Sequence, residues 1–247
     1  MISSWLRIRG VLDRVAAAFL LVVTSPVVAV LSWRIQRADD GPGIISVERV
    51  GRDGRSFRMW KLRTMRADGI DGRSNGPALT DAEDDRITPI GRRLRAYHLD
   101  ELPQLVNVVR GEMLLFGPRP ESPEYVNLDD EAWRRVLRTP PGIAGPTQMI
   151  VSEWERESIA SDPAGSVYKT QVLPVKLAID NWYLDMSSPR LDLVVAVALA
   201  KRFLPGSHAT RMKQRVVREL PDATAPVLAW ERQATASAPT EASRSIA

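Results

Sequence analysis

The 247-residue chain has no cysteine and only two histidines, His98 and His208. The lack of cysteine excludes disulfide scaffolds, thiolate zinc sites and cysteine nucleophiles. Two histidines so far apart in the sequence make a multi-histidine metal centre a poor explanation of the chain. Hydrophobic residues make up 44% of the sequence and charged residues 26%, which excludes wholesale disorder and is enough for a packed core.

The chain also has no excess of acidic residues over basic ones. The chain has 34 Lys+Arg against 30 Asp+Glu, a net charge of +4 and a pI of about 9.7. Arginine dominates the basic set and suits anionic partners such as phosphates, anionic lipids or nucleic acid. Nucleic-acid binding rests on the basic pI alone, without a recognisable binding motif, so we expect no nucleic-acid partner.

Residues 15–33 form an apolar run that no charge interrupts. As a straight helix this run would be roughly 28 Å long, just enough to cross a bilayer core. A cleaved signal peptide, a single transmembrane helix and a helix that enters one leaflet and returns are the alternatives. Pro26 favours the re-entrant form because it removes a backbone hydrogen bond, and the Ser25 hydroxyl can serve a freed carbonyl. Basic residues flank the run on both sides, so the positive-inside rule assigns neither end to the outside.

After a Gly-Pro break, the pattern predicts a β-hairpin. Residues 45–50 and 55–62 flank a Gly-Arg-Asp-Gly turn, and residues 66–86 read as a long loop. Leu102, Leu105, Val106 and Val109 predict a helix over 100–110, with Asp100 as its N-cap and Gly111 after its end.

Further helices are predicted over 129–138, 172–183 and 191–204, the last either buried or lying in a membrane interface. From about residue 222 the chain is rich in Ala, Thr, Ser and Pro, which predicts a disordered tail. Helices around a small hairpin predict an α-rich α+β fold.

Asp100 and Glu101 are adjacent carboxylates at a predicted helix start. Capping alone would explain either one. Since neighbours on a helix diverge, the pair suits two different tasks: one carboxylate could attack an electrophile while the other holds a cation that bridges a phosphate. Arginines and lysines surround the pair in sequence, and prolines on both sides restrict the backbone of Arg119. Together these residues indicate phosphate chemistry at a membrane surface.

Three stretches resemble the bacterial sugar transferase family, the monotopic polyprenyl-phosphate phosphoglycosyl transferases. They are RVGRDGRSFRMWKLRTM at 49–65, DRITPIGRRLRAYHLDELPQLVNVVRGEMLLFGPRPE at 85–121, and the apolar N-terminus with its Ser-Pro pair. The resemblance covers roughly residues 11–204. It implies the compact form of the family, essentially a catalytic domain alone.

The resemblance implies transfer of a sugar-1-phosphate from a UDP-sugar to undecaprenyl phosphate, with release of UMP, as the first step of lipid-linked glycan (exopolysaccharide) assembly. Asp100 matches the family's nucleophile, which forms a phosphosugar-enzyme intermediate, and Glu101 matches the residue that helps to bind Mg²⁺. Arg95 and Arg119 match phosphate-contacting residues. Lys61 and Arg63 match a K-x-R-T-M motif and are further expected substrate-site residues.

Ser25 and Pro26 match the helix break that makes the family's membrane segment re-entrant. We therefore expect three parts: a re-entrant membrane helix and its flank (1–40), a catalytic domain with interfacial amphipathic helices (41–205), and a basic segment with a disordered tail (206–247). The expected location is the bacterial inner membrane, with the active site on the cytoplasmic face.

The expected partners are a UDP-sugar, a polyprenyl phosphate and membrane lipid, with a second copy of the chain or downstream glycosyltransferases as open alternatives. Leu62 and His98 depart from the family's usual residues, which leaves the sugar unspecified. A non-enzymatic membrane adaptor with a basic docking face is the alternative function, and the intact Asp-Glu pair argues against it.

Overall fold

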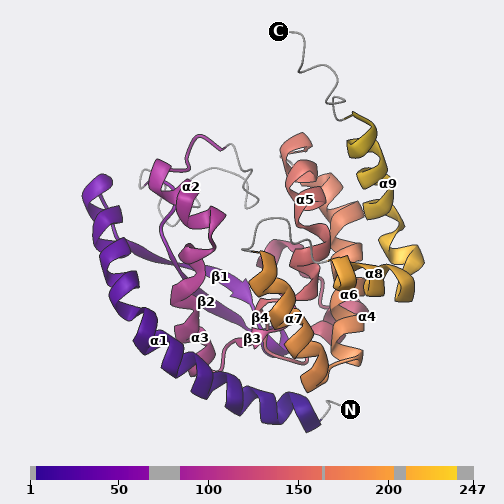
Figure 1. Ribbon diagram of the computed structural model, residues 1–247, viewed down its shortest axis with the longest axis horizontal. Coiled ribbons are helices and arrows are strands. Elements are labelled where there is room, and N and C mark those ends of the chain that lie inside the picture. Colours follow the sequence, from indigo (N-terminus) through magenta and orange to yellow (C-terminus); the bar gives the residue numbers. More distant parts are fainter. Residues whose placement is uncertain (1–3, 67–83, 163–164, 203–209, 238–247) are drawn as a thin grey trace.

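The computed structural model describes residues 4–66, 84–162, 165–202 and 210–237. The expected α-rich α+β fold is confirmed, since helices surround two small sheets (Figure 1). The strands are β1 Ile44–Val50, β2 Ser56–Leu62, β3 Leu114–Phe116 and β4 Gly142–Ala144. The longer helices are α1 Ser4–Ala38, α2 Pro89–Ala96, α3 Leu105–Arg110, α4 Glu131–Val136, α5 Pro146–Ser161, α6 Leu173–Asp185, α7 Pro189–Arg202, α8 Thr210–Glu219 and α9 Pro221–Ser237. Shorter helical turns are η1 Arg52–Gly54, η3 Leu99–Gln104, η4 Pro123–Tyr125 and η5 Tyr168–Val172.

Helix α1 continues through Pro26 as one 35-residue helix. We expected a break at Ser25-Pro26, and the structure instead has a long helix that curves around the rest of the molecule (Figure 1). Pro26 cannot donate to the carbonyl four residues earlier, which belongs to Val22. The Ser25 hydroxyl donates to that carbonyl at 2.9 Å, so the helix tolerates the proline without an orphaned acceptor.

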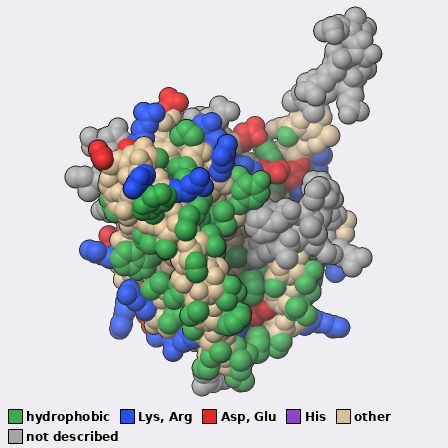
Figure 2. Space-filling model, turned by 60° about the vertical axis from the view of Figure 1, so that its left-hand side comes forward, with side chains coloured by type: hydrophobic (Ala, Val, Ile, Leu, Met, Phe, Trp, Pro, Cys, Tyr) green, Lys and Arg blue, Asp and Glu red, His purple; other side chains and the backbone are tan. Residues whose placement is uncertain are grey.

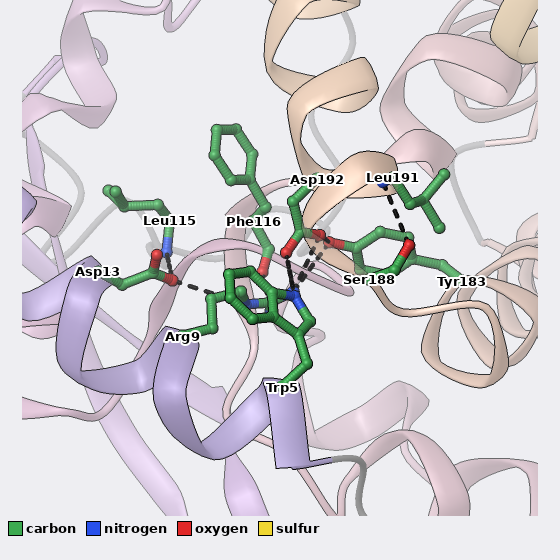
Figure 3. Close-up of polar contacts among 9 residues, drawn as sticks. All are labelled: Trp5, Arg9, Asp13, Leu115, Phe116, Tyr183, Ser188, Leu191 and Asp192. Carbon is green, nitrogen blue, oxygen red and sulfur yellow. Dashed lines mark hydrogen bonds and ion pairs between the residues drawn. The ribbon is translucent and has the colours of Figure 1, made fainter.

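The N-terminal end of α1 is fastened to α7 by a buried polar cluster (Figure 3). Arg9, only 2% exposed, donates to both carboxylate oxygens of Asp192 at 3.0 and 3.1 Å and to the Tyr183 hydroxyl at 3.1 Å. The Trp5 indole donates to the same carboxylate at 2.9 Å. A buried guanidinium with this many partners locks the start of α1 onto the folded domain.

The C-terminal end of α1 is fastened to the same domain. Ile35 is buried in a cluster with Leu62 and Leu94, which come from β2 and α2. Just past the helix, the Arg63 guanidinium donates to the main-chain carbonyls of Asp39 and Asp40 at 2.6 Å each. Both ends of the apolar helix therefore rest on one domain.

The outer face of α1 remains apolar. Its exposed side chains include Val11, Val15, Phe19, Val22 and Val27. The left-hand side of Figure 1, where α1 runs, comes forward in Figure 2, and hydrophobic side chains gather there with Lys and Arg around the margin. Within the part of the chain that the structure describes, one helix, over Ile8–Ala38, is long and apolar enough to cross a membrane by length and composition.

The predicted hairpin is confirmed. Strands β1 and β2 pair antiparallel, with Val50 opposite Ser56 and Ile44 opposite Leu62. Asp53 and Gly54 in the turn have φ values of 59° and 74°, the left-handed region that the turn residues accept.

The predicted helix over 100–110 is split in the structure. Residues 99–104 form the 3-10 helix η3, and α3 begins only at Leu105. The prediction of Asp100 as an N-cap is wrong, because this residue lies inside η3, behind His98 in the left-handed conformation (φ 54°). Gly111 ends α3 in the left-handed conformation as expected (φ 77°).

The largest hydrophobic core joins α4 to α9. The predicted helices at 129–138, 172–183 and 191–204 correspond to α4, α6 and α7, whereas α5 was not predicted. Helix α7 is buried on one face only: Leu191 and Val195 are buried, whereas Leu193 and Val197 are exposed.

Disorder from about residue 222 was predicted wrongly as far as residue 237, because this segment forms α9. Val227 is 1% exposed and joins the core, and the Trp230 indole donates to Glu157 of α5 at 2.6 Å. These two large side chains lie three residues apart on one helical face, which the Ala- and Thr-rich composition obscures. Residues 238–247, and most of the predicted loop at 66–86, lie outside the described residues.

Candidate active site

The two adjacent carboxylates have different surroundings. Asp100 is 9% exposed, and within the described part of the chain no group makes a hydrogen bond or ion pair with it. Glu101 is held by Arg119, whose two terminal nitrogens donate to its two carboxylate oxygens at 2.9 Å each. One carboxylate of the pair is therefore immobilised, and the other is buried without a bonded partner.

Arg119 is positioned by the short parallel pair of β3 and β4. Gly117 follows β3 and lies against Gly142, where a Cβ would come within 2.2 Å of the Gly117 nitrogen. This close approach brings the Ile143 carbonyl within 3.0 Å of the Arg119 guanidinium, which donates to it. The stiff Gly-Pro-Arg-Pro segment thus orients the Arg119 guanidinium toward Glu101, so its terminal nitrogens donate to the protein and are not left free for a substrate.

Lys61 lies at the end of β2, where it interacts electrostatically with Asp100 and Arg95. Asn107 of α3, fully buried, accepts from the Trp60 main-chain nitrogen at 3.1 Å and donates to the Arg58 carbonyl at 2.7 Å. These bonds tie α3 to β2 and so hold Lys61 beside the η3 turn.

Arg95 is brought to the site by the packing of α2 on Thr64. A Cβ at Gly91 would lie 2.0 Å from the Thr64 carbonyl, so only glycine allows this contact. Thr88 caps α2 by accepting from the Gly91 nitrogen, and its own main-chain nitrogen donates to the Thr64 carbonyl at 3.0 Å. The Arg95 Nε then donates to the Thr64 hydroxyl at 2.9 Å.

The pKa values of the charged residues in the site are shifted in different directions. Burial raises the pKa of Asp100, and the Glu101 charge raises it further, against the opposing effect of Lys61 and Arg95. Burial alone would also raise the pKa of Glu101, but Arg119 and His98 outweigh it and lower the pKa to about 2. Burial lowers the pKa of Lys61 to about 8. Glu101 is thus ionised at any physiological pH, whereas Asp100 and Lys61 carry charges that their surroundings disfavour.

Of the predicted site residues, the structure brings five together: Lys61, Arg95, Asp100, Glu101 and Arg119. It does not bring Arg63 with them, because this side chain is 4% exposed and its terminal nitrogens bind the carbonyls at the end of α1. Ser25 and Pro26 lie within α1.

The two departures from the family pattern lie beside the site. The His98 Nδ1 is 3.8 Å from a Glu101 oxygen, so this side chain lies beside the Asp100–Glu101 pair. Leu62 is fully buried against α1 and α2, which explains an aliphatic residue there by packing.

Two residues that position the site were missed from the sequence: Thr64 and Asn107. Asn107 carried a usable signal, since it is a polar side chain in an otherwise apolar stretch, LVNVV. Thr64 is the threonine of the K-x-R-T-M motif, but the motif alone did not reveal its role, which depends on α2 folding back onto it.

Comparison with known proteins gives the following. The profile of the family "Bacterial sugar transferase" matches residues 4–205. The UDP-glucose:undecaprenyl-phosphate glucose-1-phosphate transferase of Caulobacter vibrioides is 38% identical over 206 residues, which cover 81% of this chain and 71% of that protein. The exopolysaccharide production protein ExoY of Rhizobium meliloti is 35% identical over 195 residues, 74% of this chain and 79% of that protein. A UDP-N-acetylgalactosamine-undecaprenyl-phosphate N-acetylgalactosaminephosphotransferase of Aeromonas hydrophila is 29% identical over 203 residues, 80% of this chain but only 44% of that protein.

Proposed function

The chain belongs to the bacterial sugar transferase family, as its motifs indicated, and from this membership we propose that it transfers a sugar-1-phosphate from a UDP-sugar to undecaprenyl phosphate. The chain is accordingly a transferase. UMP is the released product, and the lipid-linked sugar that forms would begin the assembly of an exopolysaccharide or related glycan.

The observation that carries the proposed mechanism is the asymmetry of the carboxylate pair. A nucleophile must reach its electrophile, and Asp100 makes no hydrogen bond or ion pair with any described residue. Glu101 is unsuited to attack because both of its oxygens accept from Arg119. Burial also makes ionised Asp100 more reactive, since it removes the water that would stabilise the carboxylate.

In the first half-reaction, an Asp100 oxygen attacks the phosphorus that carries the sugar. The bond from this phosphorus to the bridging oxygen of the diphosphate breaks, and UMP leaves with the bridging oxygen. The product on the enzyme is an aspartyl phosphosugar. Lys61 and Arg95, which interact electrostatically with Asp100, would stabilise the negative charge on the phosphoryl oxygens, and no proton transfer is required.

In the second half-reaction, an oxygen of undecaprenyl phosphate attacks the same phosphorus. The bond between phosphorus and the Asp100 oxygen breaks, which regenerates the carboxylate and yields an undecaprenyl diphosphate sugar. Neither half-reaction needs a general base, which agrees with the scarcity of histidine in the chain.

We propose that Mg²⁺ assists, with Glu101 as its protein ligand. In the described residues, no group of three or more His, Cys, Asp or Glu side chains could hold a metal. Mg²⁺ is commonly bound by one or two carboxylates together with substrate phosphates, and Glu101 would supply the carboxylate of such a site. Each Glu101 oxygen has a second lone pair beside the one facing Arg119. When bound, the ion would neutralise charge on the diphosphate. We expect EDTA to abolish UMP release and Mg²⁺ to restore it.

We propose that α1 lies in one leaflet of the inner membrane, with the active site on the cytoplasmic face. Its exposed side chains are apolar over most of its length, and its two ends rest on one folded domain through Arg9 and Ile35. A spanning helix would place its ends on opposite sides of the bilayer, where one domain could not hold both. A soluble nucleotide sugar and a lipid phosphate could then both reach Asp100.

The proposed reaction is tested with full-length protein in nanodiscs, undecaprenyl phosphate and a panel of UDP-sugars. We expect UMP release with at least one sugar, and a mass increase of one sugar-phosphate on the peptide that contains Asp100 when the lipid acceptor is omitted. UMP release without any adduct on that peptide would contradict the covalent route.

The topology is tested by single-cysteine labelling, which the cysteine-free chain permits. Ser4→Cys and Gln36→Cys lie near the two ends of α1. We expect a membrane-impermeant reagent to label both from the same side of sealed vesicles, and labelling from opposite sides would overturn the single-leaflet topology.

A further inference from the structure

A cavity separate from the Asp100–Glu101 pair lies between the N-terminal half of α1 and the end of α3. Its volume is about 230 Å³, and the residues around it include three arginines from distant parts of the chain: Arg14, Arg52 and Arg138. Arg14 belongs to α1, Arg52 to the turn between β1 and β2, and Arg138 follows α4. The cavity shares no residue with the active site, and Asp100 and Gly111 lie at opposite ends of the η3–α3 stretch.

The positive charge in this cavity is largely uncompensated. Among the residues that the structure describes, no acidic side chain lines it, and neither Arg14 nor Arg138 has an ion pair. Among the described residues, Arg52 is paired only with its neighbour Asp53, at 3.4 Å, and both side chains are about 60% exposed. An ion pair this exposed contributes little, so the cavity offers guanidinium donors to an anion.

The place of Arg14 is set by Gly111. A Cβ at this glycine would lie 2.2 Å from an Arg14 terminal nitrogen, and its φ of +77° also favours glycine. The end of α3 thus makes room for the guanidinium of α1, the helix proposed above to lie in one leaflet.

The cavity adjoins the lipid-facing side of α1. Val11 lines it and is 61% exposed, and Val15, one residue past Arg14, is 66% exposed. The uninterrupted apolar run begins at Val15, so Arg14 marks the level at which the hydrocarbon core gives way to headgroups. A bound anion at this level would have acyl chains beside it.

We propose that this cavity binds the phosphate of an anionic phospholipid. Arginine guanidinium groups bind phosphate oxygens bidentately. An anionic phospholipid fits this cavity because its phosphate matches the arginines and its acyl chains match the apolar side of α1. The bound lipid would hold the N-terminal half of α1 at a defined depth. This assignment does not depend on the reaction proposed for Asp100.

The test uses full-length protein from nanodiscs that contain equal amounts of phosphatidylglycerol and phosphatidylcholine, released into mild detergent for native mass spectrometry. We expect the wild type to retain phosphatidylglycerol preferentially, and Arg14→Gln/Arg138→Gln to retain about tenfold less of it. The matched control is Arg134→Gln/Arg218→Gln, which removes the same charge from exposed arginines that do not line the cavity. The control should bind like the wild type.

Equal losses in both double variants would overturn the site in favour of general charge attraction, and undiminished retention in Arg14→Gln/Arg138→Gln would overturn it outright. Added inorganic phosphate should not displace the lipid. Displacement by phosphate, or a preference for undecaprenyl phosphate over phosphatidylglycerol, would assign the cavity to another ligand and overturn the proposal.

Two controls separate this result from unfolding and from catalysis. Thermal unfolding midpoints should agree between the two double variants, and if the first fails to fold, the single variant Arg138→Gln should still lower retention about threefold. UMP release in phosphatidylcholine nanodiscs should be unchanged by Arg14→Gln/Arg138→Gln, so a failure of the reaction would be seen independently.

Discussion

Two groups of buried charges lie in different parts of this molecule, one around Asp100 and one around Lys176. Lys176 of α6 donates to Glu121 at 3.1 Å, to Glu155 at 2.7 Å and to the Tyr168 hydroxyl at 2.6 Å. The Tyr168 hydroxyl in turn donates to Glu121. Burial alone would lower the pKa of Lys176, but the two carboxylates outweigh it and raise it well above its usual value. In this group every charged side chain has a bonded partner of opposite sign.

The group around Asp100 is arranged differently. Only Glu101 and Arg119 form a close pair, while Asp100 and Lys61 have no bonded partner among the described residues. A buried charge without a partner costs stability, so its presence needs an explanation outside folding. This difference supports the proposal that the group around Asp100 binds the substrate, whereas the group around Lys176 stabilises the fold.

The largest expected difference concerns the two buried aspartates. Asp100→Asn should lower UMP release by about a thousandfold or more, because the amide cannot form the phosphosugar bond. Asp180→Asn, in α6, is the matched control: burial raises the pKa of Asp180 to about 7, so an uncharged amide replaces it at modest cost. UMP release is measured for both. Undiminished turnover in Asp100→Asn would contradict the mechanism.

Lys176→Met should destabilise the protein by about 3–5 kcal/mol, because it leaves Glu121 and Glu155 buried without their cation. Chemical unfolding in micelles measures this loss. Lys176→Met/Glu121→Gln/Glu155→Gln should recover most of it, since no uncompensated charge remains. A loss below about 1 kcal/mol in the single variant would remove the proposed contrast between the two groups.

Lys61→Met should show the opposite pattern. We expect kcat/KM to fall about a hundredfold, because a cation facing the phosphoryl group is lost. Stability should be unchanged or slightly higher, since the depressed pKa of Lys61 means that the folded protein disfavours its charge. Kinetics and unfolding are measured on the same preparation, and a destabilisation as large as that of Lys176→Met would refute a functional role.

The smallest expected effect is a pH dependence. Lys61, with a pKa of about 8, is a cation below that pH and neutral above it. If its charge binds substrate, log kcat/KM should decline with a slope approaching one per pH unit above about 8. Lys61→Arg keeps the charge and should move the decline to higher pH. A decline at the same pH in Lys61→Arg would assign the titration to another group.

The elements nearest the site were largely predictable. Two strand-like segments around a Gly-Arg-Asp-Gly turn predicted the hairpin that carries Lys61, and helical periodicity predicted the apolar face of α3, whereas α2, which carries Arg95, was not predicted. The motifs around Asp100 and Arg119 indicated the family before any fold was known. The 3-10 turn at Leu99–Gln104 was not predicted, because the left-handed His98 that starts it leaves no periodic signal.

Local patterns along the chain, and the motifs they carry, were enough to indicate the fold class, the family and the identity of the two carboxylates. The tertiary structure alone decided which charges are paired: Arg63 binds the end of α1, Arg119 holds Glu101, and Asp100 remains without a bonded partner among the described residues. Pairing depends on distances of a few ångströms between segments far apart in sequence, and spacing along the chain does not encode those distances. The same reason applies to α9, where burial of Val227 outweighs a composition typical of disorder.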